Sequence, residues 1–237
     1  MYRYIMSAML SFGFAAVFAD EVPTISPSAV FTTVDGETQE GVEFSGSAPV
    51  KVSFTANPEN IGAYTATYEW RFYTQGNEDH PYLTRYEQDT EYTFNTAGVQ
   101  LVACYATFVN GTDTIAYTRD YWAETEPIRV SISESKLEMP NAFTPNGDGI
   151  NDLYKAKSGY QSIVDFHAYI FNRWGQKLYE WSDPASGWDG TYKGKPVKQG
   201  IYFCLVKAKG ADGHTYNIKK DVNLLRGYTE TDNTTKE

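Results

Sequence analysis

The first half of the chain alternates apolar and polar residues over short segments. Residues 48–56 (APVKVSFTA) alternate valine and phenylalanine with lysine, serine and threonine. Residues 64–73 (YTATYEWRFY) repeat the pattern with aromatic residues, and Trp70 lies among them. Because neighbouring side chains of a strand point to opposite faces of a sheet, this alternation predicts strands with one buried face.

Further strand-like segments surround these two. Residues 29–34 (AVFTTV) predict a first strand, residues 91–122 hold two or three more, and residues 127–133 (PIRVSIS) close the set. Asn110 and Gly111 separate two of these runs, which predicts a tight hairpin turn. No segment of this half shows the 3.6-residue period of a helix.

Strands at this short spacing, with a tryptophan in the third, predict an antiparallel Ig-like sandwich with Trp70 in its middle. The order VSFTANP, YEWRFY, YTFNTAG and LVACYATF also resembles the PKD family of Ig-like modules. Members of that family carry Trp-Asp-Phe-Gly-Asp-Gly where residues 70–73 of this chain read Trp-Arg-Phe-Tyr. The acidic turn of the family is therefore missing here.

A second β-rich half follows a polar link at residues 133–139. Residues 163–172 (IVDFHAYIFN) alternate, a turn at 172–176 (NRWGQ) follows, and residues 200–227 read as two strands joined at Ala211-Asp212-Gly213. The pattern again predicts a sandwich. The predicted fold class is all-β, with two tandem Ig-like antiparallel β-sandwich domains after a signal peptide.

The N-terminus has the three parts of a secretory signal peptide. Arg3 gives a positive region, residues 5–18 are apolar, and small residues end at Ala19. The alternative is an uncleaved membrane anchor, but the apolar run is shorter than the roughly 20 residues of a membrane span. No cysteine follows the cleavage site, which argues against a lipoprotein, and no later segment is apolar enough to span a membrane.

The predicted organisation has four parts. They are a signal peptide at 1–19, a PKD/Ig-like domain at 20–135, a second β-sandwich at 137–227 and a polar, disordered tail at 228–237.

Composition narrows the class of partner. The formal net charge of −10 and the isoelectric point of about 4.8 argue against nucleic acid, whose binding depends on clustered Lys and Arg. Aromatic residues make up 16% of the chain, with 19 tyrosines, which favours half-buried β surfaces. Cys104 and Cys204 lie in strand-like runs of different halves, so two buried thiols are expected rather than a disulfide.

The stretch PNAFTPNGDGINDLY (140–154) is the strongest candidate for chemistry. Asn146, Asp148 and Asp152 stand at relative positions 1, 3 and 7, with Asn151 beside them, which is similar to a small Ca²⁺ loop. Only two carboxylates are present and the distal Glu of an EF-hand is absent. The alternative, which we favour, is a turn in which the Asn and Asp side chains bond their own backbone.

Catalysis is not expected. His80, His167 and His214 are scattered, and no hydrolase, metalloprotease or phosphate-loop motif occurs. Asp148 and Asp152 could form a glycosidase-like acid pair, but no other segment supplies a cleft for it.

Aromatic residues are the remaining candidates for binding. Trp174, Trp181 and Trp188 either stack on sugars or anchor an interface, or, as we favour, plug the ends of the second sandwich. In the first half, a ligand-binding surface would use aromatic side chains, namely Tyr82, Tyr86, Tyr121 and Trp122.

Taken together, PNAFTPNGDGIND, IFNRWGQKLYE, WDGTYKGKPV, GIYF and VNLLRG resemble the gliding motility-associated C-terminal domain. This is the type B sorting domain of the type IX secretion system, and the resemblance covers residues 139–226. In this chain Lys198-Gln199-Gly200 replaces the usual proline-containing turn. The residues that correspond to the family's recognition motif are Pro140, Asn141, Phe143, Thr144, Pro145, Asn146, Gly147, Asp148, Gly149, Asn151, Asp152, Asn172, Arg173, Trp174, Gly175, Trp188, Asp189, Gly190, Gly200, Tyr202, Leu225 and Arg226.

The resemblance implies export by a signal peptide, then recognition of the C-terminal domain at the outer membrane. It also implies a partner, an outer-membrane β-barrel or another subunit of the secretion or gliding machinery. We expect a non-enzymatic accessory component at the cell surface, without a cofactor apart from a weakly bound Ca²⁺ as the alternative. The rival hypothesis is a surface cargo or adhesin whose first domain binds carbohydrate or protein.

Overall fold

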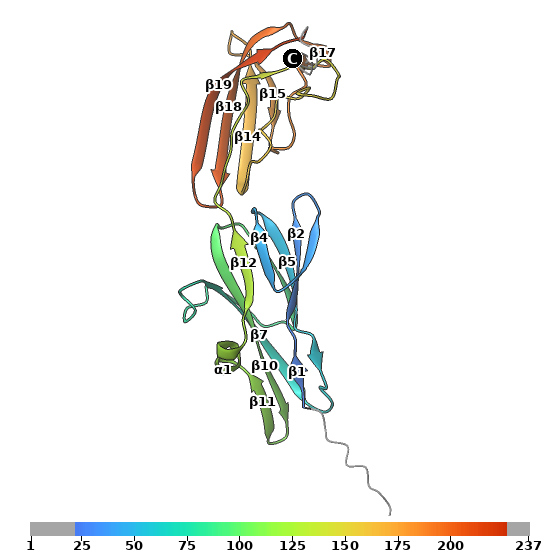
Figure 1. Ribbon diagram of the computed structural model, residues 1–237, viewed down its shortest axis with the longest axis vertical. Helices are drawn as coiled ribbons and strands as arrows, with labels where there is room; N and C mark the ends of the chain where they lie inside the picture. Colours follow the sequence, from blue (N-terminus) through green and yellow to red (C-terminus); the bar gives the residue numbers. More distant parts are fainter. Residues whose placement is uncertain (1–21, 227–237) are drawn as a thin grey trace, which may run out of the picture.

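The computed structural model describes residues 22–226, which form two β domains placed end to end (Figure 1). The N-terminal domain holds strands β1 to β12 and the C-terminal domain holds strands β13 to β19. The predicted signal peptide at 1–19 and the tail at 228–237 lie outside the described residues.

The N-terminal domain is a sandwich of two sheets. One sheet has the order β3 (Thr38–Gly41), β2 (Ser28–Thr33), β5 (Val50–Thr55) and β9 (Asp89–Phe94). The other has the order β4 (Glu43–Gly46), β12 (Ile128–Ile132), β10 (Gly98–Asn110), β7 (Thr65–Thr74) and β8 (Leu83–Arg85), with β11 (Asp113–Tyr117) also paired to β10. Two short strands, β1 (Thr24–Ile25) and β6 (Pro58–Glu59), pair separately.

The alternating residues meet between the sheets, as predicted. Trp70 is fully buried there, and its ring lies 5.5 Å from that of Phe54 in the opposite sheet. Its indole Nε1–H donates to the Gln88 carbonyl at 3.1 Å, so the polar edge of this large side chain is satisfied. The prediction of an all-β sandwich with Trp70 in its middle is confirmed.

One element of this half was not predicted. Residues Arg119–Glu124 form a short helix, α1, where only strands were expected. Its six residues are too few to show a helical period, and Thr118 makes no side-chain capping bond. A tertiary contact holds it instead, because Trp122 Nε1–H donates to the Cys104 carbonyl of β10 at 3.0 Å. Within residues 22–226, no helix has the length and apolarity needed to cross a membrane.

The C-terminal domain has one main sheet. Its strands, in order, are β13 (Ala142–Phe143), β19 (Thr215–Leu224), β18 (Gly200–Gly210), β14 (Ile163–Phe171) and β15 (Lys177–Trp181). β13 runs parallel to β19 and the other pairs are antiparallel. A small pair, β16 (Thr191–Tyr192) and β17 (Lys195–Pro196), stands apart from this sheet.

The second layer of this domain consists largely of two long loops, residues 144–162 and 182–199. Each loop contributes one fully buried aromatic side chain, Tyr154 and Trp188, to the core. The backbones of these two residues exchange a pair of hydrogen bonds of 2.8 and 3.1 Å, which joins the loops to each other. The loops therefore replace most of a second sheet over one face of the main sheet.

Both cysteines are free and buried, one in each domain. Burial raises the pKa of the Cys104 thiol to about 12 and that of the Cys204 thiol to about 11. The prediction of two buried thiols is confirmed, and both thiols stay protonated at neutral pH.

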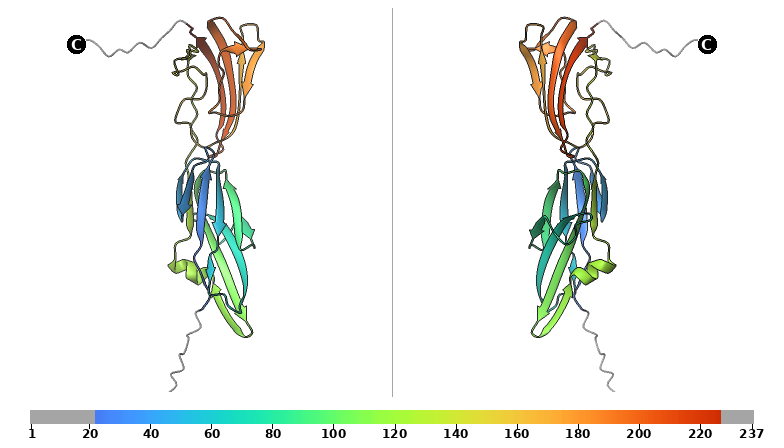
Figure 2. Two further views of the ribbon diagram at one scale, coloured as in Figure 1. Left: turned by 90° about the vertical axis from the view of Figure 1, so that its right-hand side faces the viewer. Right: turned by 90° about the vertical axis from the view of Figure 1, so that its left-hand side faces the viewer.

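The two domains meet through the turn between β18 and β19 (Figure 2). Ala211, in that turn, belongs to the core of the N-terminal domain, and its carbonyl accepts the Ala97 N–H at 3.0 Å. Nearby, the buried Ser162 hydroxyl accepts the Ala48 N–H at 3.1 Å and bonds the Ser133 hydroxyl at 2.9 Å. The domains thus share backbone hydrogen bonds and apolar packing.

Candidate functional site

The predicted motif residues gather at one end of the C-terminal domain. β18 runs from Gly200 to Gly210, and Gly210 adjoins the turn that contacts the N-terminal domain. Gly200 therefore marks the opposite end (Figure 1). We call this the distal end, and define it as residues 144–152, 172–176, 187–201 and 224–226.

Loop 144–152 is closed by its own hydrogen bonds. The Asp152 carboxylate accepts N–H groups of Asn146, Gly147 and Gly149 at 3.0, 2.7 and 2.8 Å. Backbone hydrogen bonds, that from Gly147 first, lower the pKa of this carboxyl. Gly147 and Gly149 have φ of 83° and 85°, a conformation that L side chains rarely adopt. This geometry is that of the predicted turn.

The other two predicted metal ligands are also used inside the loop. Asp148 accepts the Ile150 N–H at 2.8 Å and the Asn146 side-chain amide at 2.7 Å. The Asn146 side-chain oxygen in turn accepts the Asp148 N–H at 3.0 Å. Among residues 22–226, no group of three or more His, Cys, Asp or Glu side chains is placed to hold a metal ion.

The Asp152 hydrogen bonds make a pH-dependent contribution to stability. Because the pKa of Asp152 is lower in the folded than in the unfolded chain, its contribution is fully present above an unfolded pKa of about 4 and disappears as pH falls through the folded pKa. Asp152→Asn should therefore destabilise the protein most near pH 7 and progressively less as pH falls below about 4.

Thermal unfolding of wild type and variant across pH 2.5–7, about one measurement per half unit, checks this. Asp221→Asn, a change at an exposed aspartate of β19, is the matched control and should have little effect at any pH. A stability difference for Asp152→Asn that stays constant with pH would contradict the argument.

Several motif residues build the distal end rather than face solvent. Arg226 donates to the carbonyls of Val197 at 2.9 Å and Gly190 at 2.7 Å. A Cβ at Gly190 would lie 3.0–3.1 Å from Leu224, Arg226 and Pro145, so only glycine fits without displacement. These contacts tie the end of β19 to the loop before β16.

The start of the motif is pinned in a similar way. The Pro140 carbonyl accepts the Tyr154 hydroxyl at 3.1 Å, and the Asn141 carbonyl accepts the Asn223 N–H at 2.9 Å. Phe143 is buried, and its ring lies 5.3 Å from that of Trp188. The buried motif residues therefore stabilise the fold of the C-terminal domain.

The turn at 172–176 presents the most exposed aromatic residue. The Asn172 side-chain oxygen accepts the N–H groups of Trp174 and Gln176, both at 3.0 Å, so the turn is held rigidly. Trp174 is 82% exposed. Between this turn and residues 197–202 lies a groove of about 430 Å³, to which Arg173 and Tyr202 also contribute.

The predicted motif residues differ in exposure. The exposed members of the predicted set are Asn141, Asn146, Gly147, Asp148, Gly149, Asn151, Arg173, Trp174, Gly175, Asp189 and Leu225. Half-buried members are Pro140, Thr144, Pro145, Asp152, Asn172, Gly200, Tyr202 and Arg226, and the buried ones are Phe143, Trp188 and Gly190.

Exposed apolar side chains accompany these loops. Those of the C-terminal domain, over its described residues, lie at or beside the distal end: Ile150, Leu153, Trp174, Tyr179, Ile201, Phe203 and Leu225. The sequence analysis missed Ile201 and Phe203, because the unbroken apolar run IYFCLV of β18 does not show which face stays uncovered.

The aromatic residues predicted as binding candidates lie in different parts of the structure. Trp181 and Trp188 are buried, as packing requires, whereas Trp174 is exposed. In the N-terminal domain, Tyr121 and Trp122 pack together on α1. The other two are apart: Tyr82 packs on aromatic residues and Tyr86 is 73% exposed.

The histidines do not come together. His80 lies in the loop after β7, His167 lies on the outer face of β14 beside Asp165, and His214 packs on Tyr216. Asp148 and Asp152 bond to the loop backbone.

The distal end combines rigid turns with exposed apolar side chains, a surface suited to contact with another protein.

Residues 137–221 match a family model, the CHU_C type IX secretion signal domain. No curated protein matches the sequence. The C-terminal domain is thus a sorting domain of the type B class, as its motifs indicated. The chain carries the signal for export through the type IX secretion system.

Proposed function

We propose that the distal end of the C-terminal domain docks on an outer-membrane β-barrel or another subunit of the type IX secretion or gliding machinery, and that the protein is a small, non-enzymatic accessory component held at the cell surface. The observation that carries the proposal is the gathering of rigid motif turns and exposed apolar side chains at this one end. A signal peptide brings the chain to the periplasm first.

The most exposed part of this surface supplies the anchor. Trp174 and Ile201, 82% and 53% exposed, line the same groove and would lose water contact against a partner. Large aromatic side chains that become buried at an interface commonly dominate the binding energy. Arg173, over the Trp174 ring at 5.5 Å, adds a polar contact beside it.

An affinity pull-down from detergent-solubilised outer membranes of the native host tests the proposal. The wild-type protein is expected to capture a stoichiometric outer-membrane barrel or machinery subunit. The double variant Trp174→Ala/Ile201→Ser should weaken that complex roughly thirtyfold or more, as for an interface hot spot. Tyr86→Ala, which removes an exposed aromatic side chain from the N-terminal domain, should leave it intact.

Two results would refute docking at the distal end. One is a complex of unchanged affinity for the double variant. The other is substoichiometric capture with the protein abundant in the medium, which would make it ordinary cargo.

The protein is proposed to act without a cofactor. A Ca²⁺ ion at Asn146, Asp148 and Asp152 would have to displace hydrogen bonds that already close the loop.

The likeness of residues 20–135 to PKD modules stays a prediction. The alternative function, a surface cargo or adhesin with a ligand-binding N-terminal domain, is favoured by one observation, a cavity beside α1.

A further inference from the structure

A cavity of about 230 Å³ opens on the outer face of the larger N-terminal sheet, away from the sandwich core. Strands β7 and β10 form its floor. Its walls come from α1 on one side and from the loop between β7 and β8 on the other. Nothing in the docking proposal uses this cavity, which lies in the other domain.

The floor of the cavity is recessed because one of its side chains, that of Ala103, is small. Ala103 pairs with Arg71 across the two strands and lies between the larger Leu101 and Tyr105 along β10. Its methyl group leaves space that the longer neighbours enclose. Ala103 is only 3% exposed although it is on the outer face, because the walls cover it.

One end of the cavity holds a positioned guanidinium group. Arg71 Nε–H donates to the Glu69 carboxylate at 2.7 Å, and the guanidinium carbon lies 4.1 Å from the Tyr105 ring centroid. The hydrogen bond to Glu69 raises the pKa of Arg71, and burial raises the pKa of the neighbouring Tyr73. Tyr73 also hydrogen-bonds Arg71 and Tyr105, and the guanidinium and the phenol both keep their protons at neutral pH.

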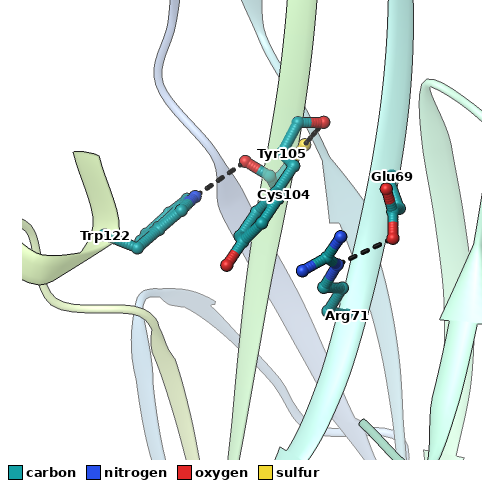
Figure 3. A network of polar contacts seen from close by, with 5 residues as sticks. All are labelled: Glu69, Arg71, Cys104, Tyr105 and Trp122. Atoms are coloured by element: carbon teal, nitrogen blue, oxygen red, sulfur yellow. Dashed lines mark hydrogen bonds and ion pairs between the residues drawn. The ribbon is translucent and has the colours of Figure 1, made fainter. Parts of the chain in front are cut away.

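Two aromatic side chains of the lining, Tyr105 of β10 and Trp122 of α1, are also held in place, and we call them the aromatic wall. Figure 3 shows the Tyr105 ring between Arg71 and Trp122. Trp122 cannot swing away without losing the 3.0 Å hydrogen bond from Nε1 to the Cys104 carbonyl. Arg71 covers one face of the Tyr105 ring, so the apolar surface in the lining comes from Trp122 and the rest of Tyr105, next to polar groups.

Acceptors stand on the opposite wall. Glu78 and Asp79 both line the cavity, and Asp79 pairs with Arg119 of α1 at 2.6 Å. The charged residues of the lining, Arg71, Arg119, Glu78 and Asp79, sum to zero. A balanced set of donors and acceptors suits hydroxyl groups, which both donate and accept, better than it suits an ion.

We propose that this cavity binds one neutral pyranose ring of a saccharide. The C–H face of the ring lies on the aromatic wall, and its hydroxyls bond Arg71 at one end and the carboxylates of Glu78 and Asp79 at the other. The cavity volume of about 230 Å³ falls below the ~300–1,000 Å³ of pockets for drug-sized ligands, which suits a single ring.

Calorimetric titration of the purified protein tests the assignment. The probes are neutral hexasaccharides of glucose, mannose and xylose, the corresponding monosaccharides, and hexagalacturonate as the charged counterpart. At least one neutral probe should bind at about millimolar concentration or below. Binding of the free monosaccharide alone would identify a small-molecule ligand, and tighter binding of its hexamer a polysaccharide; both support one-ring recognition.

Three variants locate the site. Ala103→Leu fills the floor and Arg71→Gln removes the guanidinium, and each should weaken binding about tenfold or more. Tyr86→Ala is the matched control and should bind as wild type. Circular dichroism confirms that each variant is folded, and Arg71→Gln keeps the test valid if Ala103→Leu is not.

The inference would be overturned by several results. They are no binding of any neutral probe, tighter binding of hexagalacturonate than of every neutral probe, or unchanged binding in the folded variants. A peptide ligand that alone occupies the cavity would overturn it too. Because docking at the distal end is measured separately with Trp174→Ala/Ile201→Ser, failure of one proposal leaves the other standing.

Discussion

Replacing Trp188 with alanine is expected to destabilise the C-terminal domain strongly and to reduce export. The indole is fully buried, its ring lies 5.1 Å from that of Tyr202, and its Nε1–H donates to the Thr191 carbonyl at 2.7 Å. Loss of a buried Trp side chain costs about 3–5 kcal/mol. A small domain has only about 5–15 kcal/mol in total, and here the residue also holds one loop of the second layer.

Urea unfolding followed by far-UV circular dichroism measures the effect, and fractionation of the native host measures export. Trp174→Ala is the control for the unfolding measurement only, since Trp174 is 82% exposed and its loss should change stability by no more than about 0.5 kcal/mol. Tyr86→Ala, outside the proposed docking surface, is the control for export. A Trp188→Ala protein with the wild-type unfolding midpoint, or one exported at wild-type level, would show that the loop layer is not essential.

Ala211→Asp is expected to separate the two domains without unfolding either of them. The substitution would place a carboxylate in the core of the N-terminal domain, and burial of an unpaired charge costs several kcal/mol. The hydrogen bonds described across the junction, at Ala97, Ala48 and Ser133, contribute about 0.5–1.5 kcal/mol each. Burying the charge costs more free energy than these hydrogen bonds contribute, so the β18–β19 turn is expected to leave the core of the N-terminal domain.

Nuclear spin relaxation distinguishes the two states. In the wild type, both domains should tumble with one correlation time, and in Ala211→Asp with two shorter ones. The same substitution at exposed Ala185 is the control and should keep the single correlation time. Coupled tumbling of Ala211→Asp would mean that the junction tolerates the charge, and our account of it would be wrong.

Alternation predicted the elements of the N-terminal domain well because its sheets have one covered face. Trp70 and Phe54 lie where the two-residue period places them. The same reasoning failed at α1, which is shorter than the period that would reveal it and depends on a bond from Trp122 to a distant strand. Tertiary contacts of this kind leave no local pattern.

The motifs of the C-terminal domain predicted which loops matter but not what each residue does there. Gly190 and Arg226 are partners across the loop before β16, a contact between residues 36 positions apart. The cavity beside α1 could not be predicted from the sequence for a related reason. It arises where Ala103 pairs with Arg71, and register between strands cannot be read from either strand alone.

The position of β19 makes the sorting domain depend on a strand that is synthesised late. It is the last strand among residues 22–226, yet it lies inside the main sheet, between β13 and β18. Synthesis delivers the chain from its N-terminus, so Val222 and Leu224 enter the core only after every other strand has been made. A chain that stops before β19 leaves β18 unpaired on one side and lacks the Arg226 clamp on Gly190. Machinery that reads the distal end, as proposed, would thereby reject products truncated before β19.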